Sequence, residues 1–332
     1  MLISQIKKYS SVSIVGMAKN TGKTTCLNYI LSKLKEEKYK VAVTSIGVDG
    51  EEKDILYDTL KPRITIYTGN IFVTSEKHFN EKKLEAKIIH TSKQHTALGR
   101  IITAEALSTG EVILSGPSNS ELMTEYIDKL KNLNVALTLV DGALNRLSLA
   151  SPSVTDALVL CTGAACSIKL EKLIKKVKYQ CELINIKKIS DTMLNKIDNI
   201  VSGVWLVDEN KISKLSDTLF SSNINFDAIK DSAKYIYIAG ALPDNFMKEI
   251  NRNKKLDNLT IIVRDFSRIF STLENYYKFV RKGGAFMVKQ SANLIAICSN
   301  PTSPDGYNYD PEVLRSALET ELNLPVYDIF KC

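Results

Sequence analysis

The sequence lacks any apolar run of eighteen residues, the length that a membrane-spanning helix needs, so we expect no membrane segment. The first ten residues carry Lys7 and Lys8 but no apolar stretch typical of a secretory signal, and no lipidation motif is present. Arginine is scarce, at eight of the 44 basic residues. A nucleic-acid-binding protein more often carries a stripe of arginines interleaved with aromatics, so we expect solvated lysines and no nucleic-acid partner.

Cysteine and histidine are few and scattered. The six cysteines form no CxxC pair, and only three histidines are present, so a zinc site built by the protein is not favoured. Cys26 and Cys298 lie in apolar runs, which predicts buried thiols. Because the sequence has neither a disulfide pattern nor a secretory signal, we expect a reducing, cytoplasmic location.

What the chain does have is the composition of a globular protein large enough for two domains. It has 332 residues, of which 44% are hydrophobic and 24% charged, with a net charge of +7. We expect the boundary to fall between Ala164 and Ser190, and we take residues 1–165 and 166–332 as the two domains. This mild positive charge is compatible with an anionic small molecule such as a nucleotide.

Apolar runs alternate with helical spacing, which predicts an α/β fold with a mostly parallel sheet and a C-terminal α/β region. Strands are predicted over residues 11–15, 41–46, 112–114, 135–140, 157–161, 183–186, 203–207, 235–239, 259–263 and 294–298. Helices are predicted over residues 24–37, 98–108, 120–132, 170–179 and 267–280. Residues 63–73 predict a hairpin that turns at Gly69 and Asn70.

One motif carries specific chemistry. Residues 16–25 are GMAKNTGKTT, which fits the phosphate-loop pattern G-x-x-x-x-G-K-[ST] and lies between a predicted strand and a predicted helix. Glycines let the backbone wrap closely around phosphates, while backbone N–H groups and the helix N-terminus face the anion. The residues expected to bind the nucleotide here are Gly16, Lys19, Asn20, Thr21, Gly22, Lys23, Thr24 and Thr25.

Within this loop, Lys23 is expected to reach the β- and γ-phosphates and to act in catalysis, and the Thr24 hydroxyl is expected to hold Mg²⁺. Lys19 lies four positions before Lys23, whereas the signature lysine of MinD-type ATPases lies five before. Assigning the signature-lysine role to Lys19 is therefore unsafe, and the alternative is that Lys19 is an exposed loop lysine.

Two acids follow predicted strands and are candidate Mg²⁺ ligands beside the loop. Asp49 lies in SIGVDGEE after the second strand, with a simple Asp-Gly turn as the alternative. Asp141 ends LTLVD, the apolar strand followed by an acid that is typical of a Walker B segment, and it is our second catalytic candidate. Asn145 and Arg146 follow it and are candidates for contacting nucleotide or substrate.

Three further segments have a functional and a plain interpretation. Arg100 precedes a predicted helix and is either an arginine finger or a solvated arginine. Residues 195–198, NKID, match the guanine-specifying NKxD pattern, but the residues before them predict a capped helix rather than a strand, which favours ATP over GTP. Residues 300–311 form a proline-rich loop after a predicted strand, which either shapes a binding site or is an ordinary loop.

Together the phosphate loop, SIGVDGE and VDGALNR resemble a branch of P-loop NTPases that includes dethiobiotin synthetases, the molybdopterin-guanine dinucleotide accessory protein and metal or cobalamin chaperone NTPases. Dethiobiotin synthetases have E-G-A-G-G after a strand. Here Asp141, Gly142 and Ala143 align with that run, but Leu144 and Asn145 depart from it. This departure puts a biotin-pathway substrate site in doubt.

A closer resemblance covers most of the chain. IVGMAKNTGKTTCLNYIL, VDGALNR and NPTSPDGY look like the P-loop subunits of lysine 5,6-aminomutase reactivases of lysine-fermenting bacteria. This resemblance implies an ATP- and Mg²⁺-dependent protein that rescues a B12-dependent lysine aminomutase by releasing damaged cobalamin, with a second ATPase subunit as partner. The chain lacks the D-x-H-x-x-G run of many cobalamin-binding domains, so direct cobalamin binding is unsupported.

Three functions therefore remain open at this stage. The first is an accessory ATPase with slow turnover that a partner stimulates. The second is a dethiobiotin-synthetase-like ATP-dependent ligase acting on a small carboxylate or carbamate. The third is an adaptor that binds nucleotide without hydrolysing it. The sequence does not set the oligomeric state, and a homodimer is one arrangement we consider.

Overall fold

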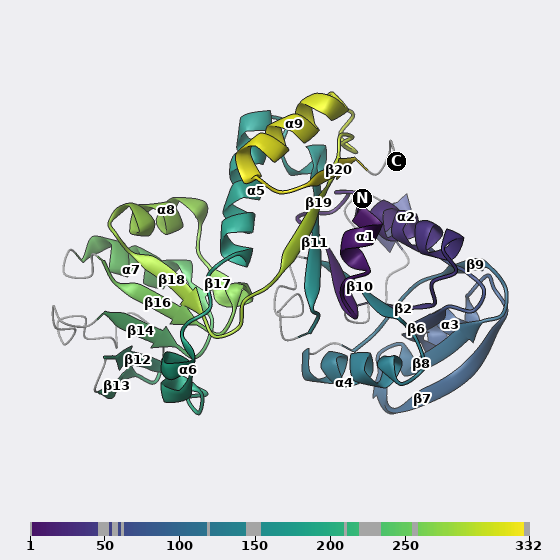
Figure 1. Cartoon of the computed structure of the whole chain (residues 1–332), viewed down its shortest axis with the longest axis horizontal. Helices are drawn as coiled ribbons and strands as arrows, with labels where there is room; N and C mark the ends of the chain where they lie inside the picture. Colours follow the sequence, from purple (N-terminus) through teal and green to yellow (C-terminus); the bar gives the residue numbers. More distant parts are fainter. Residues whose placement is uncertain are drawn as a thin grey trace. The chain divides into compact units, whose positions relative to one another are not determined.

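A computed structural model of the chain describes residues 2–45, 53–54, 59–60, 63–117, 120–143, 154–208, 211–218, 234–253 and 258–328. It confirms the α/β class, with a large mixed sheet of mostly parallel strands and helices between them (Figure 1). The chain forms two compact units, Met1–Val177 with Asn293–Cys332, and Lys178–Ala292. This division differs from the expected domains 1–165 and 166–332 because the last strands of the chain return to the first sheet.

The elements of the first unit surround its large sheet. Its strands are β1 (Ser11–Gly16), β2 (Val41–Ser45), β3 (Lys53–Asp54), β4 (Thr59–Leu60), β5 (Ile64–Ile66), β6 (Ile71–Ser75), β7 (Ala86–Thr96), β8 (Gly99–Ala106), β9 (Gly110–Val112), β10 (Leu137–Ala143), β11 (Ala157–Gly163), β19 (Leu294–Asn300) and β20 (Val326–Asp328). Its helices are α1 (Leu2–Ile6), α2 (Lys23–Glu36), α3 (Glu76–Asn80), α4 (Ser120–Lys131), the 3-10 turn η2 (Ala164–Cys166) and α9 (Pro311–Leu322), while α5 (Leu170–Ile184) crosses the division between the units.

The strands of the large sheet follow the order β20-β19-β11-β1-β10-β2-β6-β8-β7. From β20 to β6 every neighbouring pair is parallel, and β8 pairs antiparallel with both β6 and β7. Parallel strands end at one common edge of a sheet, which is where ligands collect in α/β folds. The carboxyl ends of β1, β2, β10, β11 and β19 therefore lie at the same edge.

Alternating side chains bury the two faces of this sheet under different helices. Val41, Val43 and Leu139 belong to one apolar cluster with α1 and α2, whereas Ala42 packs against Tyr126 and Leu130 of α4. This period of two along each strand is the pattern of a sheet covered on both faces. Both faces are dry, which explains why β1 and β11 are buried at every position.

Four secondary-structure predictions were wrong. Residues 98–108 form the antiparallel strand β8 rather than a helix, because β6 and β7 pair with it on both sides. Residues 63–73 do not form a hairpin, since β5 pairs with β9 while β6 joins the large sheet. Residues 183–186 do not form a strand, because the first two end helix α5 and the other two follow it, and the helix predicted over 267–280 begins only at α8 (Leu273–Arg281).

The second unit has its own sheet, in the order β13-β12-β14-β16-β18. Its strands are β12 (Val204–Val207), β13 (Ile212–Ser216), β14 (Tyr235–Ile238), β15 (Leu242–Pro243), β16 (Thr260–Val263), β17 (Ile269–Phe270) and β18 (Ala285–Val288). Its other helices are α6 (Asp191–Ile197), α7 (Asp244–Arg252) and the 3-10 turn η6 (Phe266–Arg268). The strands β14, β16 and β18 are parallel.

Helices cover both faces of this smaller sheet. Ile197 of α6 packs with Tyr237 and Ile262 on one face. On the other face, Phe286 of β18 stacks with Tyr276 at 4.9 Å between ring centroids and meets Phe279 of α8 edge-on at 5.1 Å. These contacts give the second unit an aromatic core of its own.

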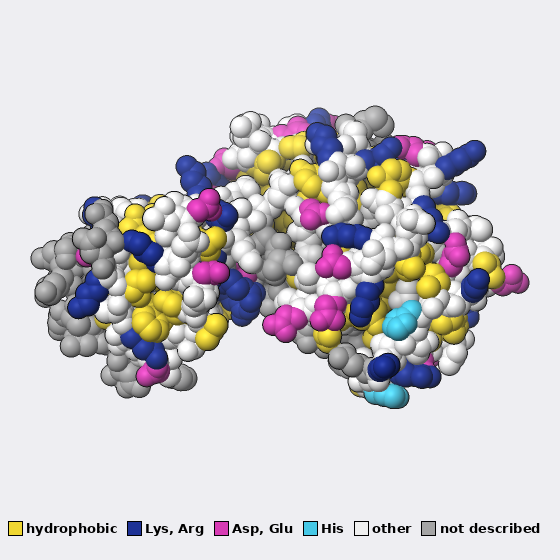
Figure 2. Space-filling model, turned by 60° about the horizontal axis from the view of Figure 1, so that its bottom comes forward, with side chains coloured by type: hydrophobic (Ala, Val, Ile, Leu, Met, Phe, Trp, Pro, Cys, Tyr) yellow, Lys and Arg dark blue, Asp and Glu magenta, His cyan; other side chains and the backbone are white. Residues whose placement is uncertain are grey.

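Charged side chains are mixed on the face drawn in Figure 2, where blue and magenta groups alternate rather than gather by sign. Many of the lysines form short surface ion pairs, such as Lys33 with Glu36 at 3.2 Å and Lys131 with Asp128 at 3.1 Å. Such exposed pairs contribute little to stability. Among the residues that the structure describes, no helix is long and apolar enough to cross a membrane.

The start of β1 is tied to the start of β11 by one carboxylate. Asp156 Oδ2 accepts hydrogen bonds from the Ser10 and Ser11 backbone N–H groups at 3.2 and 2.9 Å and from their hydroxyls at 2.7 and 2.9 Å. Burial opposes ionisation of Asp156, but the hydrogen bonds outweigh it and hold its pKa below the usual range. These bonds fix where the two central strands begin.

We predict that Asp156→Asn lowers the free energy of unfolding by about 1 kcal/mol at pH 7, since the carboxylate is partly exposed and its hydrogen bonds are screened. A depressed pKa stabilises the fold above the unfolded-state value, so this difference should shrink as the pH falls through the folded-state pKa. Urea unfolding at pH 7 and at low pH measures it. Asp128→Asn on α4 is the control, and an equal, pH-independent effect of both variants would contradict the assignment.

Candidate functional site

The connection between β1 and α2 is a tight loop over residues 17–22 whose backbone follows from its glycines. Gly22 directly precedes α2 with a φ of 82°, which favours glycine. A Cβ atom on Gly16 would lie 2.8 Å from Thr21 Oγ1, so the loop closes back over the end of the strand. Thr21 is buried and donates to the Ala18 carbonyl at 3.0 Å.

This loop leads into the positive end of a long helix. The N-cap residue of α2 is Gly22, which has no side chain to cap the first backbone N–H groups. Those groups have no partner within the helix, and the helix dipole adds partial positive charge at the same place. A loop of this shape at the end of a buried strand is suited to an anion, most of all a phosphate.

Lys23 and Asp141 meet at the mouth of the loop. The parallel pairing of β1 with β10 sets Ile14 beside Asp141 and therefore brings the end of β10 next to the loop. Lys23 Nζ lies 2.9 Å from Asp141 Oδ1, and the two side chains are 26% and 16% exposed. The predicted pair of catalytic residues is thus in direct contact, with both side chains partly open to solvent.

The other predicted loop residues differ in accessibility. Lys19, Asn20 and Thr25 are exposed, whereas Thr24 is half-buried at the first turn of α2. Thr24 and Asp141 together offer a hydroxyl and a carboxylate oxygen, which are the hard ligands that Mg²⁺ prefers. Asp49, Asn145 and Arg146 lie outside the described residues, so their predicted roles in metal and nucleotide binding remain predictions.

The sequence predicts residues 300–311 to be either a loop that shapes a binding site or an ordinary loop, and it assigns Asn300 itself no role. Asn300 ends β19, and its side-chain amide donates to the Asn20 carbonyl in the candidate phosphate loop at 3.0 Å. Its Oδ1 accepts from the N–H and hydroxyl of Thr302 at 3.0 and 2.7 Å. The close approach depends on Gly163, where a Cβ atom would lie 2.0 Å from the Asn300 carbonyl oxygen.

Two tyrosines anchor the rest of this proline-rich loop to the segment after β11. Tyr307 and Tyr309 donate their hydroxyls to the carbonyls of Ala164 and Ser167, both at 2.6 Å. The segment after β19 is therefore fixed to the segment after β11, and Asn300 is held against the candidate phosphate loop. This placement favours the functional interpretation of residues 300–311.

Arg100 does not lie before a helix as predicted. It is on strand β8, where its guanidinium pairs with Glu76 at 2.8 Å and its backbone N–H donates to the same carboxylate at 2.8 Å. These hydrogen bonds hold the pKa of Glu76 below its usual range. An arginine bound to its own surface carboxylate fits the plain interpretation better than that of an arginine finger.

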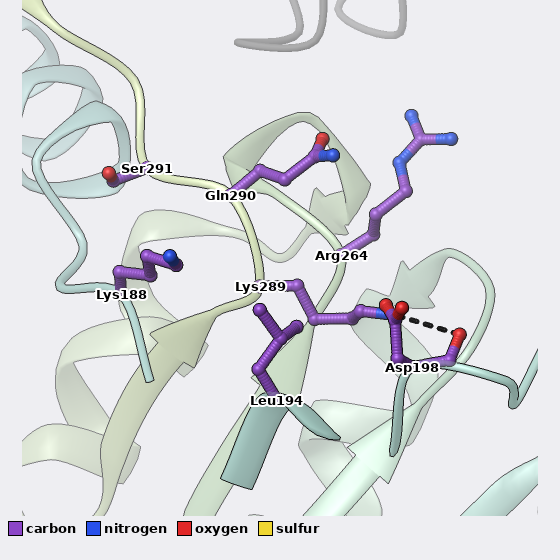
Figure 3. Close-up of a pocket in the computed structure, with 7 residues that line it drawn as sticks. All are labelled: Lys188, Leu194, Asp198, Arg264, Lys289, Gln290 and Ser291. Carbon is purple, nitrogen blue, oxygen red and sulfur yellow. Dashed lines mark hydrogen bonds and ion pairs between the residues drawn. The ribbon is translucent and has the colours of Figure 1, made fainter. Parts of the chain in front are cut away.

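The NKID segment lies on a helix, as predicted. Ser190 caps α6 by accepting from the Met193 N–H at 3.3 Å, and Asp198 directly follows the helix. Asp198 pairs with Lys289 at 3.0 Å (Figure 3). The true guanine-specifying motif ends a buried strand, so this arrangement argues against guanine recognition by these residues.

A cavity of about 480 Å³ opens at this place in the second unit. Its lining includes Arg264 and Lys289, which directly follow β16 and β18 and so stand at the carboxyl edge of the parallel strands. Lys188, Gln290 and Ser291 also line it, and Figure 3 shows Arg264 and Gln290 extending from neighbouring strand ends. The cations outnumber the single lining acid, Asp198, which suits an anionic small molecule.

A comparison of the sequence with protein-family models found no match, and comparisons with curated proteins and with solved structures found none either.

We predict that Asn300→Ala weakens binding of a fluorescent ATP analogue by about 5- to 10-fold, because it removes one hydrogen bond, worth about 1 kcal/mol, from the loop backbone. Fluorescence titration measures the dissociation constant. Asn308→Ala, an exposed position in the same loop, serves as the control. Equal affinities of both variants and the wild type would show that Asn300 does not position the loop.

Proposed function

We propose that the chain is a P-loop protein that binds and hydrolyses Mg-ATP. The observation that carries this proposal is the contact between Lys23 and Asp141 at the mouth of a glycine-bounded loop, because these are the two charges that a phosphate and its metal need. Lys23 and Asp141 meet because β1 and β10, which are more than a hundred residues apart in the sequence, pair side by side in the sheet.

The residues of the chain would divide the work as follows. Backbone N–H groups of the loop and of the first turn of α2 hold the phosphates. Lys23 exchanges its carboxylate partner for phosphate oxygens, which leaves Asp141 available to Mg²⁺ or its water ligands together with Thr24. When bound, Mg²⁺ neutralises charge that develops on the phosphate oxygens. Asn300 keeps the loop backbone in place throughout.

We propose ATP rather than GTP as the nucleotide. The NKID segment matches the guanine-specifying pattern, but it lies on a helix of the second unit and does not follow a buried strand. Beyond nucleotide binding, we propose an accessory role: the protein reactivates a B12-dependent lysine aminomutase by promoting release of damaged cobalamin. The support for this role is the sequence resemblance, which also suggests a second ATPase subunit as partner. The second unit, with its separate cavity, is the part we propose for partner or substrate binding.

An ATP-dependent ligase is the second candidate. The observation that favours it is the cation-lined cavity of the second unit, since a small carboxylate or carbamate would suit Arg264 and Lys289. The two functions differ in what triggers ADP release. A ligase needs a metabolite and forms product in proportion to ADP, whereas an accessory ATPase needs its partner enzyme.

We predict that Lys23→Ala weakens Mg-ATP binding by about 10- to 100-fold, because the change removes a charged hydrogen-bond donor aimed at the phosphates. The same variant should abolish rescue of a substrate-inactivated lysine aminomutase incubated with the candidate partner ATPase, Mg-ATP and adenosylcobalamin. Titration calorimetry and the recovered mutase activity are the two readouts. Lys129→Ala on the exposed face of α4 is the matched control.

Unchanged affinity and turnover in Lys23→Ala would end the P-loop assignment itself. Normal ATP binding by the wild type without any rescue would instead contradict only the reactivase role, and a metabolite screen for ADP release would then test the ligase.

We predict that Asp141→Asn lowers Mg²⁺-dependent turnover by about 100-fold while changing nucleotide affinity by less than about 5-fold. The reason is that the change removes a metal ligand but also frees Lys23 for the phosphates. Steady-state turnover and equilibrium binding are compared at fixed Mg²⁺, with Asp191→Asn in the second unit as the control. Equal losses of binding and turnover would mean that Asp141 acts by holding Lys23 in place.

A further inference from the structure

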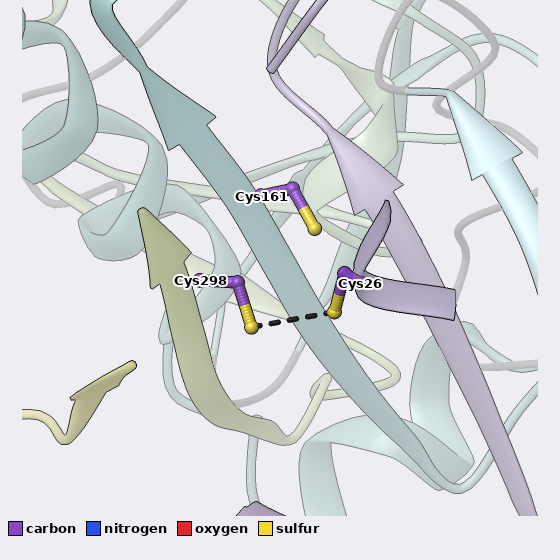
Figure 4. Close-up of side chains that lie close together, drawn as sticks. All are labelled: Cys26, Cys161 and Cys298. Atoms are coloured by element: carbon purple, nitrogen blue, oxygen red, sulfur yellow. Dashed lines mark hydrogen bonds between the residues drawn. The ribbon is translucent and has the colours of Figure 1, made fainter. Parts of the chain in front are cut away.

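Three cysteines that are far apart in the sequence meet beneath the candidate phosphate loop. Cys26 lies in the first turns of α2, Cys161 on β11 and Cys298 on β19, and the strand register sets Cys161 beside both Gly16 and Cys298. Their three sulfur atoms lie within 4.8 Å of one another, and Cys26 Sγ is 3.3 Å from Cys298 Sγ. Figure 4 shows the side chains converging between the helix and the sheet.

The surroundings of these sulfurs are dry and apolar. Cys26 and Cys161 are fully buried, and Cys298 is 1% exposed. All three belong to the main apolar cluster of the first unit, together with residues such as Leu27 and Ala296. In the part of the chain that the structure describes, they are the only group of three or more histidine, cysteine or acidic residues with metal-binding spacing.

The distances fit a metal ion better than they fit a disulfide. A metal 2.3 Å from three sulfurs in a trigonal plane separates the sulfurs by about 4.0 Å, which falls between the observed 3.3 Å contact and the 4.8 Å limit. A disulfide needs a sulfur separation of about 2.0 Å, and none of the three cysteines is part of a disulfide. Small side-chain adjustments would therefore suffice to close the cluster around one ion.

The number and type of donors narrow the choice of metal. Structural zinc is almost always four-coordinate, and iron–sulfur clusters use four cysteines in their common forms, whereas this site offers three sulfurs. Thiolates select soft ions such as Cu(I).

Hydrogen bonds among the three thiols shift the pKa values of Cys161 and Cys26 in opposite directions. Hydrogen bonds from Cys26 and Cys298, together with the nearby Lys23 ammonium, lower the pKa of Cys161 to about 5 despite its burial. The hydrogen bonds to Cys161 and Cys298 raise the pKa of Cys26.

We propose that Cys26, Cys161 and Cys298 form a three-sulfur binding site for one Cu(I) ion. Binding of Cu(I) to the three thiols forms three copper–sulfur bonds and breaks two S–H bonds, and the two released protons pass to water. With two thiolates and one remaining thiol, the Cu(I)-loaded site carries a net charge of −1. Copper stays in the Cu(I) state, so the step requires no oxidant or reductant.

The site is mechanically connected to both ends of the candidate phosphate loop. The Cys26 N–H donates to the Gly22 carbonyl at 2.8 Å, and the Cys161 carbonyl accepts from the Met17 N–H at 2.9 Å. A bound ion would hold Cys26 and Cys161 in place, and through them both ends of the loop. Cu(I) binding should therefore change the affinity for ATP. This last consequence rests on the proposed nucleotide function, whereas Cu(I) binding itself does not.

The experiment titrates the reduced full-length chain with Cu(I) under anaerobic conditions, in competition with a chromogenic Cu(I) chelator. We expect one Cu(I) per chain. Changing second-shell groups alone costs about 10- to 100-fold in metal affinity, so Cys161→Ser should cost at least about 100-fold. Cys181→Ser, a buried cysteine of the second unit outside the cluster, should bind as the wild type does.

A second measurement needs no variant that could misfold. X-ray absorption of copper in the wild-type protein should show three sulfur neighbours at about 2.3 Å.

Three outcomes of these two experiments would each overturn the proposal. They are Cu(I) binding no tighter than in the Cys26→Ser, Cys161→Ser, Cys298→Ser triple variant, copper with only two sulfur neighbours, and preferential binding of Zn²⁺. ATP affinity, measured separately, tells failure of this site apart from failure of the nucleotide site.

Discussion

The parallel pairing of β1 with β10 is the constraint on which the rest of the first unit depends. It fixes the end of the strand that precedes the candidate phosphate loop against the end of the strand that carries Asp141. Because β11 and β19 extend the same parallel sheet on the other side of β1, Gly163 and Asn300 reach the loop from there. One sheet edge thus collects a cation, a carboxylate and an amide around a loop suited to phosphate.

Much of this arrangement could be predicted from local sequence. SVSIV followed by GMAKNTGKTT specifies a strand, a glycine-dependent loop and a helix, and VALTLVD specifies a buried strand ending in an acid. The secondary-structure predictions for these segments were correct because burial, turn chemistry and spacing all favour the same structure. The helix prediction for residues 98–108 was wrong because their short apolar pattern fits either a helix or a strand. Only the pairing with β6 and β7 determines that this segment is a strand.

Long-range pairing explains the remaining differences. Nothing near Asn293 in the sequence indicates that the chain leaves the second unit there and returns to β11, so the domain limits could not be placed correctly. The role of Asn300 and the meeting of Cys26, Cys161 and Cys298 have the same origin, since strand register and the packing of α2 on the sheet bring these residues together. Cys26 and Cys298 were predicted to be buried, and they are, but their proximity depends on how α2 packs against the sheet.

The most direct test of the central claim is hydrogen–deuterium exchange of the full chain with and without Mg-ATP. Binding at the loop should slow exchange in residues 16–26 and in the segment after β19, because nucleotide contacts and Asn300 hold both in place. Slowed exchange confined to these segments of the first unit is the result that our account predicts. Unchanged exchange there, with protection instead around Arg264 and Lys289, would contradict it.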